Sequence, residues 1–337
     1  MEPGQMFVPI LLFIAGLALL IKGGDWFVDG SVELAHRLHI PELIIGATVV
    51  SIGTTLPEVL VSATGAIEGH GGIAYGNAIG SVICNTALIS ALTFAIRPCK
   101  VDGETFRVPV IFFFAAAAIY AATAYTTGYF SRWIGILLLA VFAAYMFFTI
   151  WNGKKKGLIG GNAGEAAEGA DDAESDKDVP LWLSIVKLVL GAACIAVGAK
   201  LLVENGTKIA EMLGVPESVI ALTFVALGTS LPELVTAITA LIKGHSALSL
   251  GNIVGANLFN LVLVSGMATA IRPFSIYELG SKTIGSTPVS LFVDLPVMIF
   301  VMAFMTLPAL KRGKLTRVQG IILLCVYAAF CTFQFIF

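Results

Sequence analysis

The sequence has little charge. Only 12% of its 337 residues are Asp, Glu, Lys or Arg, whereas a soluble globular domain has about 25%. Hydrophobic residues make up 57%, and the mean hydropathy is +0.92. The net charge is −2, and its few charges cluster in loops, so no nucleic-acid partner is expected. This composition excludes a soluble domain and predicts an integral membrane protein whose surroundings are a lipid bilayer.

Cysteine is also sparse, and the five residues show neither metal-ligand spacing nor the density of a disulfide framework: Cys84, Cys99, Cys194, Cys325 and Cys331. The intramembrane-enzyme patterns HExxH, GxGD and GxSxG are absent from the sequence. We therefore expect neither an enzyme nor a resident cofactor, and no obligatory protein partner is evident.

Long apolar runs are abundant. A spanning helix needs about 20 mostly apolar residues. The first run, from Met6, lacks the basic flank of a secretion signal and is read as a spanning helix. The prediction is an all-α integral membrane protein with ten transmembrane helices, at residues 7–34, 42–67, 72–97, 108–127, 132–151, 181–210, 217–242, 247–271, 289–308 and 316–336.

A segment at 152–180, rich in Gly, Ala and charge, separates two halves at 1–151 and 181–337 and is read as a flexible linker. If the N-terminus lies outside, most basic residues fall in inner loops, as the positive-inside rule requires. These are Arg37, Arg97, Lys100, Arg107, Lys154, Lys155, Lys156, Lys177, Lys243, Lys311, Arg312, Lys314 and Arg317, against Arg132, Lys208, Arg272 and Lys282 outside. We expect both termini outside, the linker in the cytoplasm, and a plasma (cell inner) membrane location.

The two halves contain a repeat. Residues 46–98 recur as 221–273 at a fixed offset of 175, which is the separation of Glu58 from Glu233. Matching residues include Pro41 and Pro216, Thr48 and Thr223, Gly76-Asn77 and Gly251-Asn252, and Ile96-Arg97-Pro98 and Ile271-Arg272-Pro273. Because each half has five helices, an odd number, the two repeats must have opposite topology. Inverted repeats with interrupted helices indicate a secondary transporter with its site at the midplane.

The strongest repeated motif is GTTLPE at 53–58, which recurs as GTSLPE at 228–233. Pro57 removes the N–H that would bond the Gly53 carbonyl, so we expect the second helix to open near its middle. The motif brings hydroxyls next to a carboxylate in each repeat: Thr54, Thr55 and Glu58, and Thr229, Ser230 and Glu233. These are the oxygen ligands of a hard cation such as Ca²⁺, and a cation would offset the cost of burying two charges.

A second repeated element, GNAIGSVICN at 76–85, recurs as GNIVGANLFN at 251–260. Ser81 and Asn85 share one helix face, and Asn260 is the counterpart of Asn85. The glycine pairs of the element are small-xxx-small patterns that favour close helix packing. The sequence leaves open whether Asn77 and Asn252 order the helix starts or face the site.

Together these motifs resemble the two α-repeats of the cation/calcium antiporter superfamily, and most closely the prokaryotic sodium/calcium exchangers. The resemblance implies that the transported ions are Ca²⁺ and Na⁺, and that the first and sixth helices slide as gates. Central ligands would be Glu58 and Glu233, with Thr54, Thr55, Thr229 and Ser230 beside them, backbone carbonyls of Ser51 and Ala226, and a shell completed by Ser81, Asn85 and Asn260. Two positions depart from the pattern: Asn260 stands where the well-known exchangers have aspartate, and Ala256 where serine is usual.

Three other functions remain open from the sequence. A calcium/proton antiporter would neutralise the two glutamates with protons, although the abundant hydroxyls favour sodium. A potassium-dependent sodium/calcium exchanger would use the same superfamily motifs. A cation channel would pass current without a counter-ion.

Overall fold

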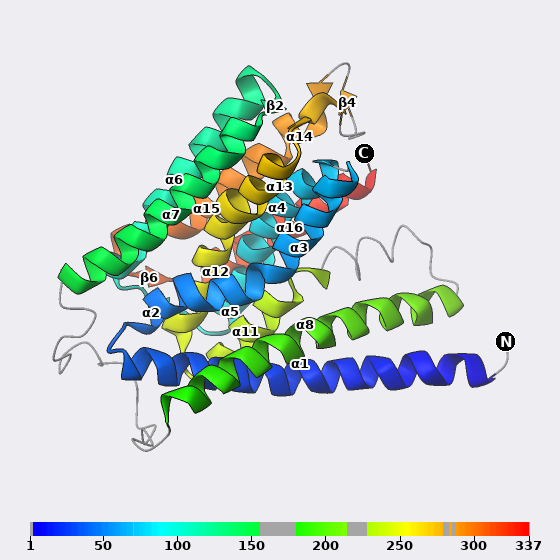
Figure 1. Ribbon diagram of the computed structural model, residues 1–337, viewed down its shortest axis with the longest axis vertical. Coiled ribbons are helices and arrows are strands. Elements are labelled where there is room, and N and C mark those ends of the chain that lie inside the picture. The colour runs from blue at the N-terminus through cyan, green and yellow to red at the C-terminus, as the bar shows by residue number, and fades with distance from the viewer. Residues whose placement is uncertain are drawn as a thin grey trace.

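The protein is almost entirely helical (Figure 1). The computed structural model describes residues 3–69, 71–155, 180–213, 228–278, 283–284 and 287–336. Within these ranges nine helices are long and apolar enough to cross a membrane, and the shorter apolar helix Leu231–Ile242 occupies the place of the seventh expected span. The predicted all-α membrane fold with ten transmembrane segments is confirmed.

In the first half the helices are α1 (Pro3–Arg37), α2 (Glu42–Ile45), η1 (Gly46–Val50), α3 (Ser51–Glu68), α4 (Gly71–Cys84), η2 (Asn85–Ser90), α5 (Ala91–Ile96), α6 (Gly103–Thr126) and α7 (Arg132–Lys155). In the second half they are α8 (Leu181–Met212), α11 (Leu231–Ile242), α12 (Ser246–Phe259), η4 (Asn260–Val264), α13 (Ser265–Ile271), η5 (Ile276–Glu278), α14 (Val289–Phe292), α15 (Asp294–Arg312) and α16 (Arg317–Ile336). The segments η1, η2 and η4 are π-helical and continue neighbouring α-helices, whereas η5 is a 3₁₀ turn.

Most predicted spans match in position, although several ends differ: α6 begins at Gly103 rather than at residue 108, and α7 ends at Lys155 rather than at residue 151. The first helix begins earlier and ends later than expected, at Pro3 and Arg37. The ninth is divided at Val293, a turn residue between α14 and α15. Pro296 lies in the first turn of α15, where its missing N–H removes no intrahelical bond, so the proline favours a new helix start.

The two repeats are intertwined. The last two helices of the first half, α6 and α7, pack against α12 and α13, whereas α15 and α16 pack against α4 and α5. Short antiparallel strands also pair between the two halves. Strand β1 (Cys99–Lys100) pairs with β6 (Lys314–Leu315), and β2 (Tyr129–Phe130) pairs with β3 (Phe274–Ser275). A further two-residue pair joins β4 (Thr283–Ile284) to β5 (Thr287–Pro288). Each half therefore completes the core of the other.

Helices α1 and α8 form a separate long pair beside this core, as Figure 1 shows. They are antiparallel: Gly16 lies against Gly198, and Gly23 lies against Gly191. A Cβ at Gly16 would lie 2.9 Å from the Gly198 carbonyl oxygen, so the seam requires glycine on both helices. Because α1 and α8 are repeat-related, their antiparallel contact is direct evidence for inverted topology.

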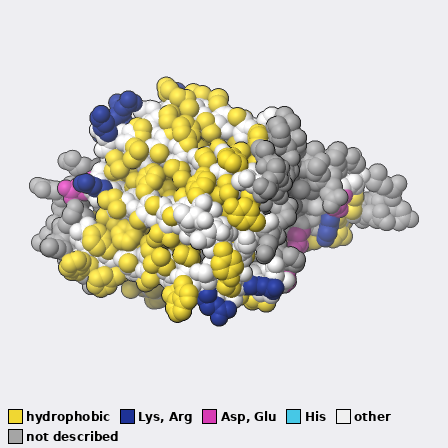
Figure 2. Space-filling model, turned by 90° about the horizontal axis from the view of Figure 1, so that it is seen from above, with side chains coloured by type: hydrophobic (Ala, Val, Ile, Leu, Met, Phe, Trp, Pro, Cys, Tyr) yellow, Lys and Arg dark blue, Asp and Glu magenta, His cyan; other side chains and the backbone are white. Residues whose placement is uncertain are grey.

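The outer surface is largely apolar. Hydrophobic side chains cover most of the face in Figure 2, with basic side chains at its edges. Large exposed apolar residues lie along α1 and α8, among them Phe7, Leu11, Ile14, Trp182 and Val189. An apolar surface of this extent fits lipid contact rather than water.

The start of α6 offers a simple test of the local structure. The Asp102 carboxylate accepts hydrogen bonds from the backbone N–H of Glu104 and of Thr105, at 3.1 and 3.2 Å. Asp102→Ala is expected to lower the free energy of unfolding by about 1 kcal/mol, the usual value of such a cap. Thermal unfolding in detergent measures this. Asp102→Asn retains an acceptor and should be milder, and equal losses in both variants would contradict the capping role.

Candidate functional site

Two glutamates from opposite repeats are buried together at the centre of the core. Glu58 of α3 and Glu233 of α11 are both 0% exposed. Their carboxylates lie close enough to interact electrostatically. None of their four carboxylate oxygens has a hydrogen-bond partner among the described residues. Buried carboxylates are normally paired or hydrogen-bonded, so two unpartnered carboxyl groups buried together are exceptional and mark a candidate functional site.

Other polar groups around the two carboxylates are also buried without partners in the described part of the chain. They are the hydroxyls of Thr55 and Ser230 and the side-chain amides of Asn85 and Asn260. Segment η2, which begins at Asn85, packs against α11 of the other repeat. Segment η4, which begins at Asn260, packs against α3. Each amide is therefore carried to the glutamate helix of the opposite half.

The π-helical turns at these asparagines explain how the chain opens. A π-turn leaves backbone carbonyls without their usual helical N–H partners and is common at functional sites. The Ser265 hydroxyl donates to the Asn260 carbonyl at 3.2 Å, and its repeat counterpart Ser90 donates to the Thr86 carbonyl. A serine thus stands at the end of each turn and satisfies one of its carbonyls, which keeps the irregular backbone acceptable inside a membrane.

The predicted opening at Gly53 and Pro57 is wrong in position for the first repeat. Helix α3 runs without interruption through Pro57, and the irregular turn precedes it as η1. The side chains that satisfy freed carbonyls lie at η1 instead: Ser51 Oγ donates to the Gly46 carbonyl at 2.7 Å, and the Tyr145 hydroxyl donates to the Ala47 carbonyl at 2.8 Å. Support of this kind makes an irregular turn acceptable inside a membrane.

The second repeat does break at the motif. Thr229 and Ser230 form a turn, and α11 starts at Leu231, with Pro232 in its first turn. The same hexapeptide therefore has two backbone conformations in the two halves. The helix predicted at 217–242 is seen here from residue 228 onward, and its earlier part lies outside the described residues.

The remaining predicted site residues are distributed as follows. Thr54 and Ser51 are buried on α3, Ser81 is buried on α4, and Thr229 is half-buried. Ala226 lies outside the described residues. The sequence left the roles of Asn77 and Asn252 open. In the structure both side chains face the hydroxyls of the opposite repeat, and their contacts are detailed below.

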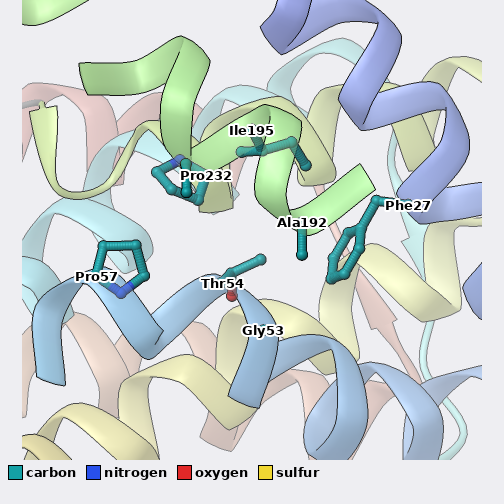
Figure 3. A pocket seen from close by; sticks show the side chains of 8 residues that line it. Phe27, Gly53, Thr54, Pro57, Ala192, Ile195 and Pro232 are labelled. Atoms are coloured by element: carbon teal, nitrogen blue, oxygen red, sulfur yellow. The ribbon is translucent and has the colours of Figure 1, made fainter. Parts of the chain in front are cut away.

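A small cavity adjoins the site, with room for about one water molecule. Figure 3 shows Phe27 of α1 and Ala192 and Ile195 of α8 on one side, facing Thr54 of α3 and Pro232 of α11. The cavity therefore lies where the α1–α8 pair meets both motif helices. A Cβ at Gly53 would lie 3.0 Å from the Phe27 ring, so this glycine allows the close approach of α1.

Ion pairs join α1 to the core at one end. Lys243 follows α11, and its Nζ lies 2.8 Å from Asp29 Oδ1 and 3.2 Å from Asp25 Oδ1. Partial burial lowers the pKa of Lys243, but the hydrogen bonds and charges of Asp29 and Asp25 raise it more, and the net pKa lies above the usual lysine value. The raised pKa of Lys243 therefore contributes stability that is fully present below the usual lysine pKa and is lost as the pH rises through the raised value.

The geometry defines a class of protein. A membrane fold of two intertwined inverted repeats, with polar side chains from both halves buried together, is the architecture of a secondary transporter. The sodium/calcium exchanger protein family matches residues 8–151 and 183–336 of this chain, one match in each half. The chain belongs to that family.

Relatives and solved structures agree with the assignment. The sodium/calcium exchanger MaX1 of Methanosarcina acetivorans is 30% identical, over 97% of this chain and 99% of its own. The putative antiporter CaxA of Alkalimonas amylolytica is 33% identical, over 96% and 98%. A structure of the sodium-calcium exchanger NCX_Mj, soaked with 10 mM Na⁺ and no Ca²⁺, superposes with a TM-score of 0.75 at 31% identity, covering 96% of this chain and 98% of that one.

Proposed function

We propose that this protein exchanges Ca²⁺ for Na⁺ across the membrane at the site of Glu58 and Glu233. The observation that carries the proposal is the pair of fully buried carboxylates, from opposite repeats, without a partner among the described residues. Two ionised carboxylates this close repel one another, and a cation between them converts the repulsion into attraction. No cysteine or histidine belongs to the proposed ligand set, which favours a hard cation.

Calcium and sodium would compete for the same oxygens. One Ca²⁺ satisfies both carboxylates and takes 6–8 oxygen ligands. The hydroxyls and amides supply neutral oxygens, among them Thr55, Ser230, Asn85 and Asn260, which suit singly charged Na⁺ next to one carboxylate. Asparagine at 260 and alanine at 256 give this site one possible charge and one hydroxyl fewer than the superfamily pattern. We infer that it holds fewer sodium ions at once.

Alternating access would follow from sliding of the α1–α8 pair over the core. The motif glycines present a surface without side chains to both gate helices: Gly53 faces Phe27 of α1, and Gly228 faces Val203 of α8. The cavity in Figure 3 lies on this sliding surface. The proposed halves at 1–151 and 181–337, the linker at 152–180, and a plasma-membrane orientation with both termini outside are part of this proposal.

The Lys243 ion pairs would close the inner side of this gate. Thr239 of α11 faces α1, since a Cβ at Gly24 would lie 2.9 Å from its hydroxyl. Lys243→Glu places a third negative charge beside Asp25 and Asp29. It is expected to raise labelling of Thr239→Cys by an impermeant maleimide about two- to fivefold, since exposed pairs contribute about 0.2–1 kcal/mol. Native cysteines are replaced in both backgrounds.

Lys243→Arg preserves the charge and serves as the control for this labelling experiment. It should leave the labelling rate at the parent value. A Lys243→Glu protein that labels no faster than its parent would show that these ion pairs do not hold the gate.

Calcium-45 uptake into sodium-loaded proteoliposomes tests the proposed function. The vesicles are diluted into sodium-free buffer containing calcium, with protein-free liposomes as the control. Uptake that requires internal sodium supports exchange. Uptake driven by an acidic interior without sodium would instead identify a calcium/proton antiporter, a requirement for potassium would identify the potassium-dependent variant, and flux without any counter-ion would identify a channel.

A further inference from the structure

Asn77 and Asn252 occupy equivalent positions in the two repeats, and each contacts the motif helix of the other repeat. Asn252 is 0% exposed, and Asn77 is half-buried. Neither belongs to the proposed ligand set. Each makes a hydrogen bond that crosses from one half of the molecule to the other, and Asn77 also donates to the Glu58 carbonyl.

Asn252 holds the first motif helix. Its side-chain Oδ1 accepts a hydrogen bond from the Thr54 hydroxyl at 3.1 Å. Ser51 Oγ lies 3.4 Å from the same oxygen and 2.9 Å from the Asn252 main-chain oxygen. The Thr54 hydroxyl therefore donates to a residue of α12, whereas the Ser51 hydroxyl, which donates to the Gly46 carbonyl, only lies beside that residue.

Asn77 makes the mirror-related contact with the second motif. Its Oδ1 accepts from the Thr229 hydroxyl at 3.5 Å and from Ser81 at 3.4 Å. Its Nδ2 donates to Ser62 Oγ at 3.0 Å and to the Glu58 carbonyl at 3.4 Å. Because a carbonyl can only accept, the amide nitrogen must face Glu58, and the amide oxygen must face Thr229.

The two contacts have one chemical consequence in common. A hydroxyl has one proton and two lone pairs. When the proton is donated to an asparagine oxygen, only lone pairs remain for any other neighbour. Thr54 and Thr229 are then fixed as electron-pair donors, the form in which a hydroxyl binds a cation, and they need no reorientation when the ion arrives.

We propose that Asn252 and Asn77 are positioning residues, which set cation affinity by orienting the Thr54 and Thr229 hydroxyls of the opposite repeat. This inference rests on the proposed cation site. The coupling is specific to each pair: Asn252 acts through Thr54, and Asn77 acts through Thr229.

The two pairs are not identical. Ser62 accepts from the amide nitrogen of Asn77, whereas Ala237 stands at the equivalent position for Asn252. The Asn252 Nδ2 accordingly has no partner among the described residues. The side chain of Asn252 is held through its oxygen alone, at 3.1 Å by Thr54 and at 3.4 Å by Ser51, so removing the Thr54 hydroxyl should remove its shorter contact.

Double-mutant cycles test the pairing. Each asparagine and each threonine is replaced by alanine, singly and in all four combinations. The sodium concentration for half-maximal calcium uptake is measured in proteoliposomes, beside the maximal rate. The shift in melting temperature on adding CaCl₂ in detergent is measured in parallel. Asn257→Ala is the matched control, because Asn257 also bridges the repeats, through Thr86 at 2.8 Å, but its amide nitrogen bonds Thr86 and Met302 rather than a motif threonine.

The expected result is a half-saturating sodium concentration raised about two- to tenfold by Asn252→Ala, in line with the loss of one hydrogen bond. Adding Thr54→Ala to Asn252→Ala should raise this concentration little further. Adding Thr229→Ala to Asn252→Ala should raise it by the product of the two single-variant factors. For Asn77→Ala the added Thr229→Ala should have little further effect, and the added Thr54→Ala should act independently. Asn257→Ala should lower the melting temperature of the ion-free protein without changing half-saturation.

Equal coupling in matched and crossed pairs would overturn the inference, as would an Asn257→Ala shift as large as that of Asn252→Ala. A wild-type protein without sodium-dependent uptake would reject the proposed exchange instead. The calcium-induced thermal shift then still tests the pairing, because it requires binding and not transport. If Asn252→Ala fails to fold, Asn252→Ser provides the same cycle with a smaller cavity.

Discussion

Sodium-driven calcium uptake is expected to fall at least about 100-fold when Glu58 or Glu233 is replaced by glutamine. Glutamine keeps the size of the side chain and one carbonyl oxygen, so packing around the fully buried position is preserved. It removes one of the two charges that would face the cation. Breaking a buried charged arrangement costs about 3–5 kcal/mol, and each 1.4 kcal/mol is a tenfold change.

The measurement is calcium-45 uptake at equal amounts of reconstituted protein. Glu211→Gln, at an exposed position near the end of α8, is the control and should transport like the wild type. The double variant Glu58→Gln with Glu233→Gln should be no more than slightly worse than either single one, since one lost charge already disables the shared site. Retention of a tenth or more of the activity by both single variants would contradict the two-carboxylate site.

Gly251→Ala is expected to destabilise the fold strongly. A Cβ at Gly251 would lie 2.2 Å from the Leu43 carbonyl oxygen, and a Cβ at the facing Gly46 would lie 2.4 Å from the Leu248 carbonyl oxygen. Both obstacles are backbone, which cannot rotate aside. The predicted small-residue packing of the 251–255 element therefore joins α12 to α2 and η1. Overpacking of this kind costs roughly 1–3 kcal/mol.

The thermal midpoint and folded yield in detergent measure the Gly251→Ala effect. Gly103→Ala is the matched control, because a Cβ at Gly103 would meet nothing within 4 Å and its backbone is helical. It should leave the midpoint unchanged. The contact of α12 with α2 and η1 also keeps Ser51 next to Asn252. The fraction of Gly251→Ala protein that folds should therefore bind calcium more weakly. A thermal midpoint of Gly251→Ala equal to that of the wild type would show that α12 can move away from α2 and η1 without loss of stability.

Much of this architecture was predictable because its signals are local in sequence. Spanning helices are read from apolar length, and inverted topology follows from an odd number of helices in each repeat. Glu58 and Glu233 were predictable as a pair because the hexapeptide recurs. The structure confirms their burial, although their role as ion ligands stays a prediction.

The details of the backbone were less accessible. The irregular turn lies at η1 rather than at Pro57, and Ser51 and Tyr145 satisfy its carbonyls, although Tyr145 lies far away in the chain. A local pattern cannot contain that contact. The π-turns carried a weak signal, since a serine follows five residues after both Asn85 and Asn260.

The exchange of partners between repeats was hidden as well. Asn77 and Asn252 were visible in the repeat, but their role depends on which helix each one faces. The helix that each asparagine faces depends on the packing between the repeats, in which α6 and α7 pack on the second repeat and α15 and α16 pack on the first. The sequence offset identifies equivalent residues, whereas the intertwined packing decides which of them meet.

Equilibrium binding of calcium-45 to the purified protein, with sodium as competitor, tests the central claim most directly. A single site shared by Glu58 and Glu233 predicts about one bound calcium per chain, displaced competitively by sodium and lost in both Glu58→Gln and Glu233→Gln. Calcium that stays bound at saturating sodium, or that binds both variants like the wild type, would place the ion elsewhere and contradict the account.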